Sequence, residues 1–227
     1  MISSILISLA RFIVMALTDA AMIPALLVMQ RNRRHFELFI GCFHLIISFI
    51  FNISGAWGVN IFLSELEWHF ISDVLSITYA LVLCVHLMGL PNENQNILLR
   101  YLAFALTWIM KVKDQWDSTL FETILIAIYA IMVLIRHFTP PTKPGDKISL
   151  NADHATKAVI SLAMLGLVYL VSESTFVESD PLSIIYGLYH IIAGALFYYA
   201  WLSVPCRDTW KKSDDYLLPQ HGNGSFV

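Results

Sequence analysis

The sequence predicts an all-α polytopic membrane protein, a bundle of seven transmembrane helices with its N-terminus outside and its C-terminus in the cytoplasm. Three observations support this fold class. The 227 residues are 57% hydrophobic and 14% charged, with a mean hydropathy of +0.66, whereas soluble domains are roughly 45–50% apolar and about 25% charged. The apolar residues form long continuous runs, and the basic residues gather between alternate runs. Disorder is therefore excluded, and a water-soluble globule is disfavoured.

The expected helices follow from the length of the apolar runs, because about 20 apolar residues cross a bilayer as an α-helix. Strands of a membrane barrel would instead alternate apolar and polar residues. The expected spans cover residues about 2–29, 37–55, 68–90, 97–112, 118–136, 156–174 and 182–203. The seven-helix transmembrane domain thus occupies residues 1–204, and residues 205–227 form a polar cytoplasmic tail.

Flanking residues delimit the first four spans. The first span continues well past Arg11, which makes it longer than the core of a signal peptide. A basic segment at 30–35 precedes the second span, and a connection with Glu65 and Glu67 precedes the third. The fourth span is the weakest, because it is short and carries Arg100 near its start.

The distribution of charge around all spans sets the expected orientation. The connection at 136–157 follows the fifth span, an acidic segment follows the sixth, and the tail after the seventh begins with basic residues. The connections expected inside, together with the tail and Arg100, hold 11 of the 14 lysines and arginines. Positively charged loops stay in the cytoplasm. An outside N-terminus, an inside C-terminus and an odd number of spans therefore agree.

Polar side chains within the spans are the candidate functional residues, because an ionisable group inside a bilayer is costly. They are Arg11 and Asp19 in the first span, His44, Ser48 and Asn52 in the second, His69 and Asp73 in the third, and Tyr186 and His190 in the seventh. In the second, third and seventh spans, spacings of four residues place these groups on one face of each helix, whereas Arg11 and Asp19 stand apart. A rise of about 1.5 Å per residue puts most of the polar groups at a similar depth. We expect one polar cluster that faces the outer or lumenal side. For Asp19, which lies in mid-span, we expect an interior hydrogen-bond partner or a protonated carboxyl group.

Four segments carry a resemblance to a known family. They are Phe43 to Asn52, Glu67 to Asp73, Lys113-Asp114-Gln115-Trp116, and Ile185 to His190. Together they resemble the seven-helix group that contains myomaker and the GPI-anchor phospholipase of the post-attachment pathway. That group is part of the CREST superfamily, with the alkaline ceramidases and adiponectin receptors. The resemblance spans almost the whole chain and implies a zinc-dependent lipid amidase or esterase.

The resemblance also implies site residues. The superfamily pattern is Ser-x-x-x-His on the second helix, an Asp early in the third, and His-x-x-x-His on the seventh; the histidines hold zinc, and Ser and Asp orient a zinc-bound water. Ser48 and Asp73 match the catalytic positions and His190 matches a metal-ligand position. Asn52 and Tyr186 stand where the other two histidines would be, and both are weak zinc ligands. We therefore expect no cofactor, with zinc as the alternative.

Two other arrangements would restore a charged centre. A shifted metal site would use His44, His69, His190 and Asp73, since His44 and His69 each lie one turn from a family position. Alternatively, Arg11 would supply the positive charge that zinc would have supplied, by pairing with Asp73.

Two classes of function remain. The first is a membrane protein of the myomaker group with a degenerate zinc site and a non-catalytic role in binding lipids or organising membranes. The second is a metal-dependent lipid hydrolase, an amidase or esterase, with a modified site at Ser48, Asp73 and His190. The expected partners are membrane lipids and not nucleic acid, because the net charge of −3 leaves no large basic surface. The expected location is the plasma membrane or an endomembrane.

Overall fold

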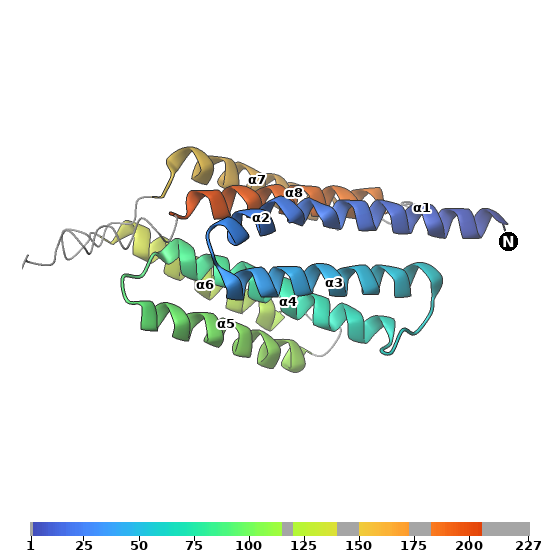
Figure 1. Cartoon of the computed structure of the whole chain (residues 1–227), viewed down its shortest axis with the longest axis horizontal. Coiled ribbons are helices and arrows are strands. Elements are labelled where there is room, and N and C mark those ends of the chain that lie inside the picture. The colour runs from blue at the N-terminus through green and yellow to red at the C-terminus, as the bar shows by residue number, and fades with distance from the viewer. Residues whose placement is uncertain (1, 115–119, 140–149, 173–182, 206–227) are drawn as a thin grey trace, which may run out of the picture.

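The structure, a computed structural model, describes residues 2–114, 120–139, 150–172 and 183–205, and these form a bundle of helices with no β-sheet (Figure 1). The elements are α1 (Ile2–Asp19), the 3-10 turn η1 (Ala20–Met22), α2 (Ile23–Arg31), α3 (His35–Trp57), α4 (Glu65–Met88), α5 (Glu93–Asp114), α6 (Leu120–Phe138), α7 (Ala152–Ser172) and α8 (Ile184–Ser203). Apart from η1 and α2, each helix has 18 to 24 residues. At about 1.5 Å per residue, these lengths match a hydrocarbon core about 30 Å thick.

Six helical stretches among the described residues are long and apolar enough to cross a membrane. They are Ile5–Arg31, His35–Trp57, Glu65–Met88, Leu120–Phe138, Ala152–Val171 and Ile184–Ser203. The chain is therefore an all-helical, multi-pass integral membrane protein. Helix α5, which contains the expected fourth span at 97–112, is not among the six, because polar and charged residues occupy its first turns and its end.

Local capping explains where the helices end relative to the expected spans. Helix α4 begins at Glu65, before the expected 68, because Ser64 and Glu67 form a capping box in which the Glu67 carboxylate accepts the Ser64 backbone N–H at 2.7 Å. It stops before Gly89, whose φ of 51° ends the helix in the left-handed region. The expected tail, apart from Pro205, lies outside the described residues, as do the outer residues of the expected spans at 118–136, 156–174 and 182–203.

The first membrane-spanning stretch changes geometry at η1, directly after Asp19. Pro24 lies in the first turn of α2 and has no N–H to donate to the preceding turn. Helix α8 approaches this turn closely at Gly194, where a Cβ atom would lie 2.5 Å from the Ala21 carbonyl oxygen. Pro24 in α2 and the lack of a side chain at Gly194 in α8 thus allow the close contact that positions Asp19.

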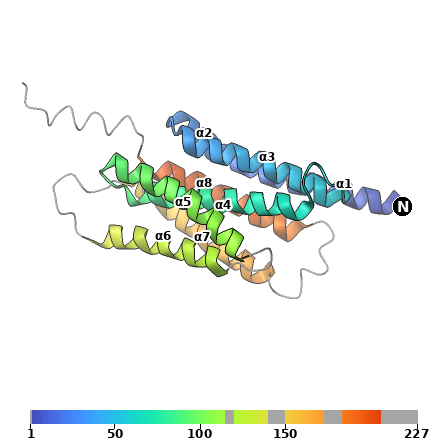
Figure 2. The ribbon, with the colours of Figure 1, turned by 90° about the horizontal axis from the view of Figure 1, so that it is seen from below.

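The helices pack as two layers that share one edge (Figures 1 and 2). In one layer, α8 packs against α7 and against α1 and α2; in the other, α4 packs against α3, α5 and α6. The layers are joined where α1 and α2 contact α3. At the opposite edge of the described bundle, α6 and α7 do not pack closely against each other. Space therefore remains between the layers.

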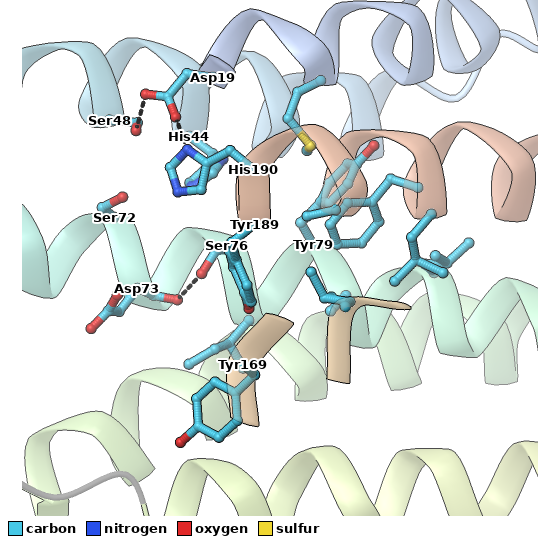
Figure 3. A pocket seen from close by; sticks show the side chains of 18 of the residues that line it. Asp19, His44, Ser48, Ser72, Asp73, Ser76, Tyr79, Tyr169, Tyr189 and His190 are labelled. Carbon is cyan, nitrogen blue, oxygen red and sulfur yellow. Dashed lines mark hydrogen bonds and ion pairs between the residues drawn. The ribbon is translucent and has the colours of Figure 1, made fainter. Parts of the chain in front are cut away.

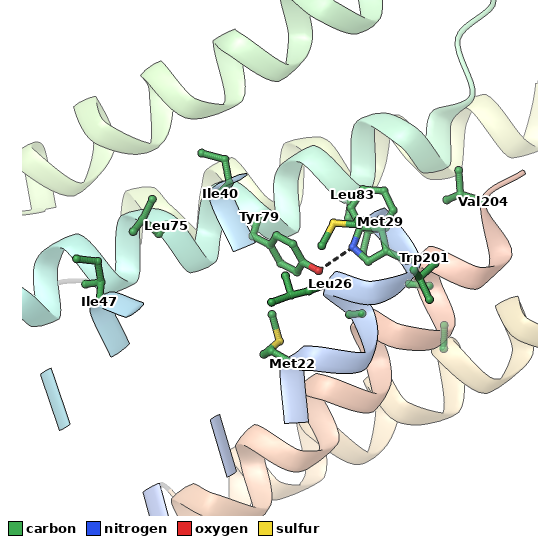
Figure 4. Close-up of a cluster of buried hydrophobic side chains, with 14 of the residues drawn as sticks. Met22, Leu26, Met29, Ile40, Ile47, Leu75, Tyr79, Leu83, Trp201 and Val204 are labelled. Atoms are coloured by element: carbon green, nitrogen blue, oxygen red, sulfur yellow. Dashed lines mark hydrogen bonds between the residues drawn. The ribbon is translucent and has the colours of Figure 1, made fainter. Parts of the chain in front are cut away.

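An apolar core fills the joined edge of the two layers (Figure 4). Its buried members include Met22, Leu26 and Met29 from the first stretch, Ile40 and Ile47 from α3, Leu75, Tyr79 and Leu83 from α4, and Trp201 from α8. The Trp201 side chain is fully buried, and its indole N–H donates to the Tyr79 hydroxyl at 2.9 Å. Because the polar tips of both aromatic residues are satisfied, their large apolar surfaces can be buried at little cost.

A buried ionic network, which we call the Glu37 network, joins the helices where α3 begins and α4 ends. Glu37 is 1% exposed, and its Oε1 lies 2.6 Å from His86 Nε2 and 2.7 Å from Arg100 Nη1. Arg34 contacts the other ring nitrogen of His86 at 2.5 Å and donates to the Pro205 carbonyl at 3.0 Å. The network therefore connects α3, α4, α5 and the segment that follows α8.

Glu37 and Glu93 both contact Arg100, but we expect their removal to have very different effects on the free energy of unfolding. We expect Glu37→Ala to lower the free energy of unfolding by about 3 kcal/mol or more, because it leaves buried charges unpaired. Glu93→Ala is the matched control: Glu93 is 54% exposed and lies 3.2 Å from the same arginine, and an exposed pair contributes at most about 1 kcal/mol. Denaturant titration in mixed micelles, followed by tryptophan fluorescence, measures both. Equal effects of the two substitutions would contradict the assigned role of the network.

Candidate functional site

A cavity of about 1170 Å³ lies between the two layers of helices. Side chains of α1, α3, α4, α6, α7 and α8 line it. Along α4 the lining extends from Glu65 to Leu87, which corresponds to about 33 Å of helix. The cavity is therefore elongated and runs through most of the thickness of a bilayer.

The character of the lining changes along the cavity. Helices α4, α6 and α8 run in the same direction through the bundle (Figure 1), and each contributes polar side chains from its first turns. These are Glu65, His69, Ser72, Asp73 and Ser76 on α4, Glu122 on α6, and Tyr186, Tyr189 and His190 on α8. Later turns of the same helices contribute mainly apolar side chains, including Leu83, Leu87, Ile126, Val133, Leu196 and Phe197. The cavity is thus polar towards the start of these helices and largely apolar beyond.

Asp19 is the centre of the first polar group, which we call the Asp19 cluster (Figure 3). Asp19 is 6% exposed. Its Oδ2 accepts hydrogen bonds from the Ser48 hydroxyl at 2.6 Å and from the Asn52 side-chain amide at 2.7 Å, and its Oδ1 contacts His190 Nδ1. These contacts occupy both oxygens of a carboxylate whose burial would otherwise be costly. One acidic side chain therefore joins α1, α3 and α8.

The order of the groups in the Asp19 cluster differs from that of a nucleophilic triad. In a Ser-His-Asp triad the histidine lies between the serine and the acid and takes the serine proton. Here the acid lies between Ser48 and His190, and Ser48 donates to it directly. The Nδ1 atom of His190 is engaged by Asp19, which leaves Nε2 as the ring nitrogen available to a ligand. This geometry orients Ser48 and His190 and does not couple one to the other for nucleophilic attack.

A second polar group, the Lys111 cluster, lies on the other layer. Lys111 Nζ is 2.9 Å from Asp73 Oδ2 and 2.7 Å from Glu122 Oε1, and the lysine side chain is only 3% exposed. His69 Nδ1 lies 3.6 Å from the same oxygen of Asp73. Asp114 accepts the backbone N–H groups of residues 121 and 122, which holds the start of α6 beside this cluster. Lys111 thus links α5 to two carboxylates that line the cavity.

The structure divides the predicted site residues between these two clusters. Ser48, Asn52 and His190 meet at Asp19, whereas Asp73 and His69 lie with Lys111. The expected pairing of Arg11 with Asp73 is not found: Arg11 lines the cavity, but among the described residues it forms no ion pair with a carboxylate.

The two remaining predicted residues also line the cavity. The Tyr186 ring packs against the His190 ring, with 4.4 Å between their centroids. The Nδ1 atom of His44 is buried and has no hydrogen-bond partner among the described residues.

Sequence reasoning missed the role of Asp19 as the centre of a cluster and the burial of Lys111 and Glu122. Two signals point to them. Pro24 follows Asp19 closely and marks a break in the helix, where a polar side chain can turn inward. Lys111 and Glu122 carry opposite charges and both fall inside expected spans, which favours a pair buried within the bundle.

The fold and the cavity define a multi-pass helical membrane protein with an elongated amphipathic cavity between its helices. The chain belongs to the family described as protein of unknown function (DUF3522), whose family model matches residues 7–191. The matched range contains every residue of the Asp19 and Lys111 clusters. A comparison with curated proteins gives no significant match.

The Asp19 cluster predicts strong coupling between Asp19 and Ser48. We expect Asp19→Ala to lower the free energy of unfolding by about 3 kcal/mol, because it leaves several buried donors without an acceptor. Ser48→Ala removes one donor and is expected to cost about 1 kcal/mol. In the double variant, the loss should be smaller than the sum by about 1 kcal/mol, as measured in a double-mutant cycle by denaturant titration. Asp153→Ala, at an exposed carboxylate outside the cavity, is the control; strictly additive losses would refute direct coupling.

Proposed function

We propose that this chain binds a membrane lipid in the cavity between its two helical layers and acts in lipid binding or membrane organisation without hydrolysing the lipid. The observation that carries the proposal is the cavity itself, about 1170 Å³ in volume and lined along α4 from Glu65 to Leu87, a length of about 33 Å. Ligand pockets for small molecules commonly measure about 300–1,000 Å³. A larger cavity with one polar and one apolar part matches the shape and chemistry of a lipid.

The proposal includes a seventh membrane span formed by α5. Helix α5 has 22 residues, enough for about 33 Å, and it packs against both α4 and α6. It carries the chain from the end of the bundle where α4 finishes back to the end where α6 starts (Figure 1). Burial of Lys111 against Asp73 and Glu122 removes the main cost of placing its charge in the bilayer.

An outside N-terminus and a cytoplasmic C-terminus belong to the same proposal. Arg31, Arg33 and Arg34 lie in and after the last turn of α2, at the end of the bundle where α8 also finishes. Basic residues next to short loops favour the cytoplasmic side. The polar part of the cavity would then face the outer or lumenal half of the membrane.

The resemblance to the CREST superfamily supports a role with lipids, and the donor set supports the loss of catalysis. We infer a divergent member of the myomaker-like group with a degenerate zinc site. Of the three histidine positions, only His190 is retained, while Asn52 donates to Asp19. Among the described residues, no three His, Cys, Asp or Glu side chains are placed to share a metal ion. These residues do not fit a zinc ion, for which three protein ligands form the usual catalytic site.

A lipid amidase or esterase at Ser48, Asp73 and His190 is the alternative function. It would require Ser48 and Asp73 to act on one reacting centre. Asp73 pairs instead with Lys111, and Ser48 with Asp19. The geometry therefore favours binding over hydrolysis.

Filling the cavity tests the proposed function. We expect Ala80→Phe on α4 and Ala193→Phe on α8, two residues of the lining, to weaken lipid retention by about tenfold, or about 1.4 kcal/mol. Phenylalanine at either site would occupy space needed by the ligand. Mass spectrometry of lipids retained by the purified full-length protein in detergent measures the effect.

Ala163→Phe is the matched control, because Ala163 is exposed on α7 and does not line the cavity. Each variant must also keep the wild-type thermal unfolding midpoint, so that lost lipid reports on the cavity alone. Retention of the same lipids at the same level by all three variants would overturn the proposal. Turnover of a bound ester or amide lipid by the wild type, abolished in Ser48→Ala, would favour the hydrolase instead.

A further inference from the structure

The charge around the polar part of the cavity is unbalanced. Asp19, Glu65, Asp73 and Glu122 line it with carboxylates. Against these four acids, the described residues supply two lysine or arginine side chains: Arg11, which lines the cavity and forms no ion pair with a described carboxylate, and Lys111, which pairs with Asp73 and Glu122. The two acids of the Lys111 cluster share a single ammonium group, and Asp19 is held by hydroxyl, amide and imidazole groups. Buried carboxylates that outnumber the cations attract a positive ligand, because a buried charge is stable only when it is compensated.

Aromatic rings also line the cavity, next to His190. Tyr186, Tyr189 and His190 pack together on α8, with ring centroids of Tyr186 and Tyr189 6.5 Å apart. Tyr169 of α7 also lines the cavity, and Figure 3 shows Tyr169 and Tyr189 on the side of Asp73. Tyrosine faces attract cations through the ring quadrupole, most strongly where water is excluded. The ring faces offer no such attraction to an anionic headgroup.

His44 supplies an independent indication of the ligand. It lines the cavity, and its buried Nδ1 has no hydrogen-bond partner among the described residues. Leaving a buried polar atom without a partner is costly, and such atoms are rare in native proteins. A ligand that carries N–H donors would satisfy an accepting Nδ1, whereas a quaternary ammonium group has no N–H to offer.

We propose that the cavity selects an amphiphile with a primary ammonium headgroup and a long hydrocarbon chain. The headgroup would lie between the Asp19 cluster and Asp73 and Glu122, against the tyrosines, with an N–H directed to His44. The chain would extend along the apolar part formed by residues such as Leu83, Leu87 and Phe197. This inference names the ligand class of the proposed lipid-binding function and rests on that function.

Four probes of equal chain length test headgroup selection on the full-length protein in phosphatidylcholine nanodiscs. Octadecylamine, octadecyltrimethylammonium, octadecanol and stearate are each added at the same mole fraction, and native mass spectrometry counts the bound amphiphile. We expect octadecylamine to bind about tenfold or more tightly than octadecanol, because charge compensation and the tyrosine faces act only on the cation. Octadecyltrimethylammonium should fall between them, and stearate should bind least.

Substitutions in the cavity test whether its side chains are responsible for the headgroup preference. Glu122→Gln removes one carboxylate while Asp73 still pairs with Lys111, and it should lower octadecylamine binding by about tenfold while leaving octadecanol unchanged. Glu93→Gln, at an exposed carboxylate outside the cavity lining, is the matched control. His44→Phe should reduce the preference for octadecylamine over the trimethylated probe. Folding of each variant is checked by its octadecanol binding.

The outcomes separate this inference from the function on which it rests. If octadecanol and octadecylamine bind equally and Ala80→Phe blocks both, the cavity binds lipids without selecting an ammonium group, and this inference is wrong. Preferential binding of stearate would overturn it as well. If Ala80→Phe weakens the binding of none of the four probes, the proposed lipid-binding function itself is wrong.

Discussion

The buried carboxylate of Asp19 is the interaction on which the arrangement of the two layers depends. It lies at the end of α1, where the first span turns, and it collects a hydroxyl and an amide from α3 and an imidazole from α8. A lone carboxylate inside a bilayer is expensive, so its partners must be brought to it. The contact of Gly194 with the turn after α1 allows α8 to come close enough. The edge that joins the layers, and hence the cavity beside it, follows from this requirement.

In this bundle, polar and ionic contacts, and not the burial of apolar surface, determine which helices become neighbours. Apolar helices gain little by leaving lipid for one another, so helix association in membranes depends on packing and polar contacts. The Glu37 network, the Asp19 cluster and the Lys111 cluster lie at different places along the bundle and together involve nearly all of its helices. The Lys111 cluster also explains how the least apolar helix, α5, can belong to the bundle. Each cluster specifies neighbours that apolar surface alone would not distinguish.

The same charges give the cavity its chemistry. Three of the residues that hold helices together, Asp19, Asp73 and Glu122, also line the cavity. The side chains that hold the helices together therefore also give the cavity its polar character. At the centre of the Asp19 cluster, an acid lies between Ser48 and His190.

The sequence by itself determined that the chain is helical and crosses the membrane several times, because apolar runs of about 20 residues have no other stable form in a bilayer. It also placed Ser48, Asn52 and His190 at a common depth, since helical rise is regular. Only the tertiary structure decided that these residues meet at Asp19 and that Asp73 lies with Lys111. Depth along a helix follows from residue number, but the partner that a side chain meets depends on helix rotation and neighbour order. Helix rotation and neighbour order depend on all the contacts between helices. The spacing of polar and apolar residues within one span does not reveal those contacts.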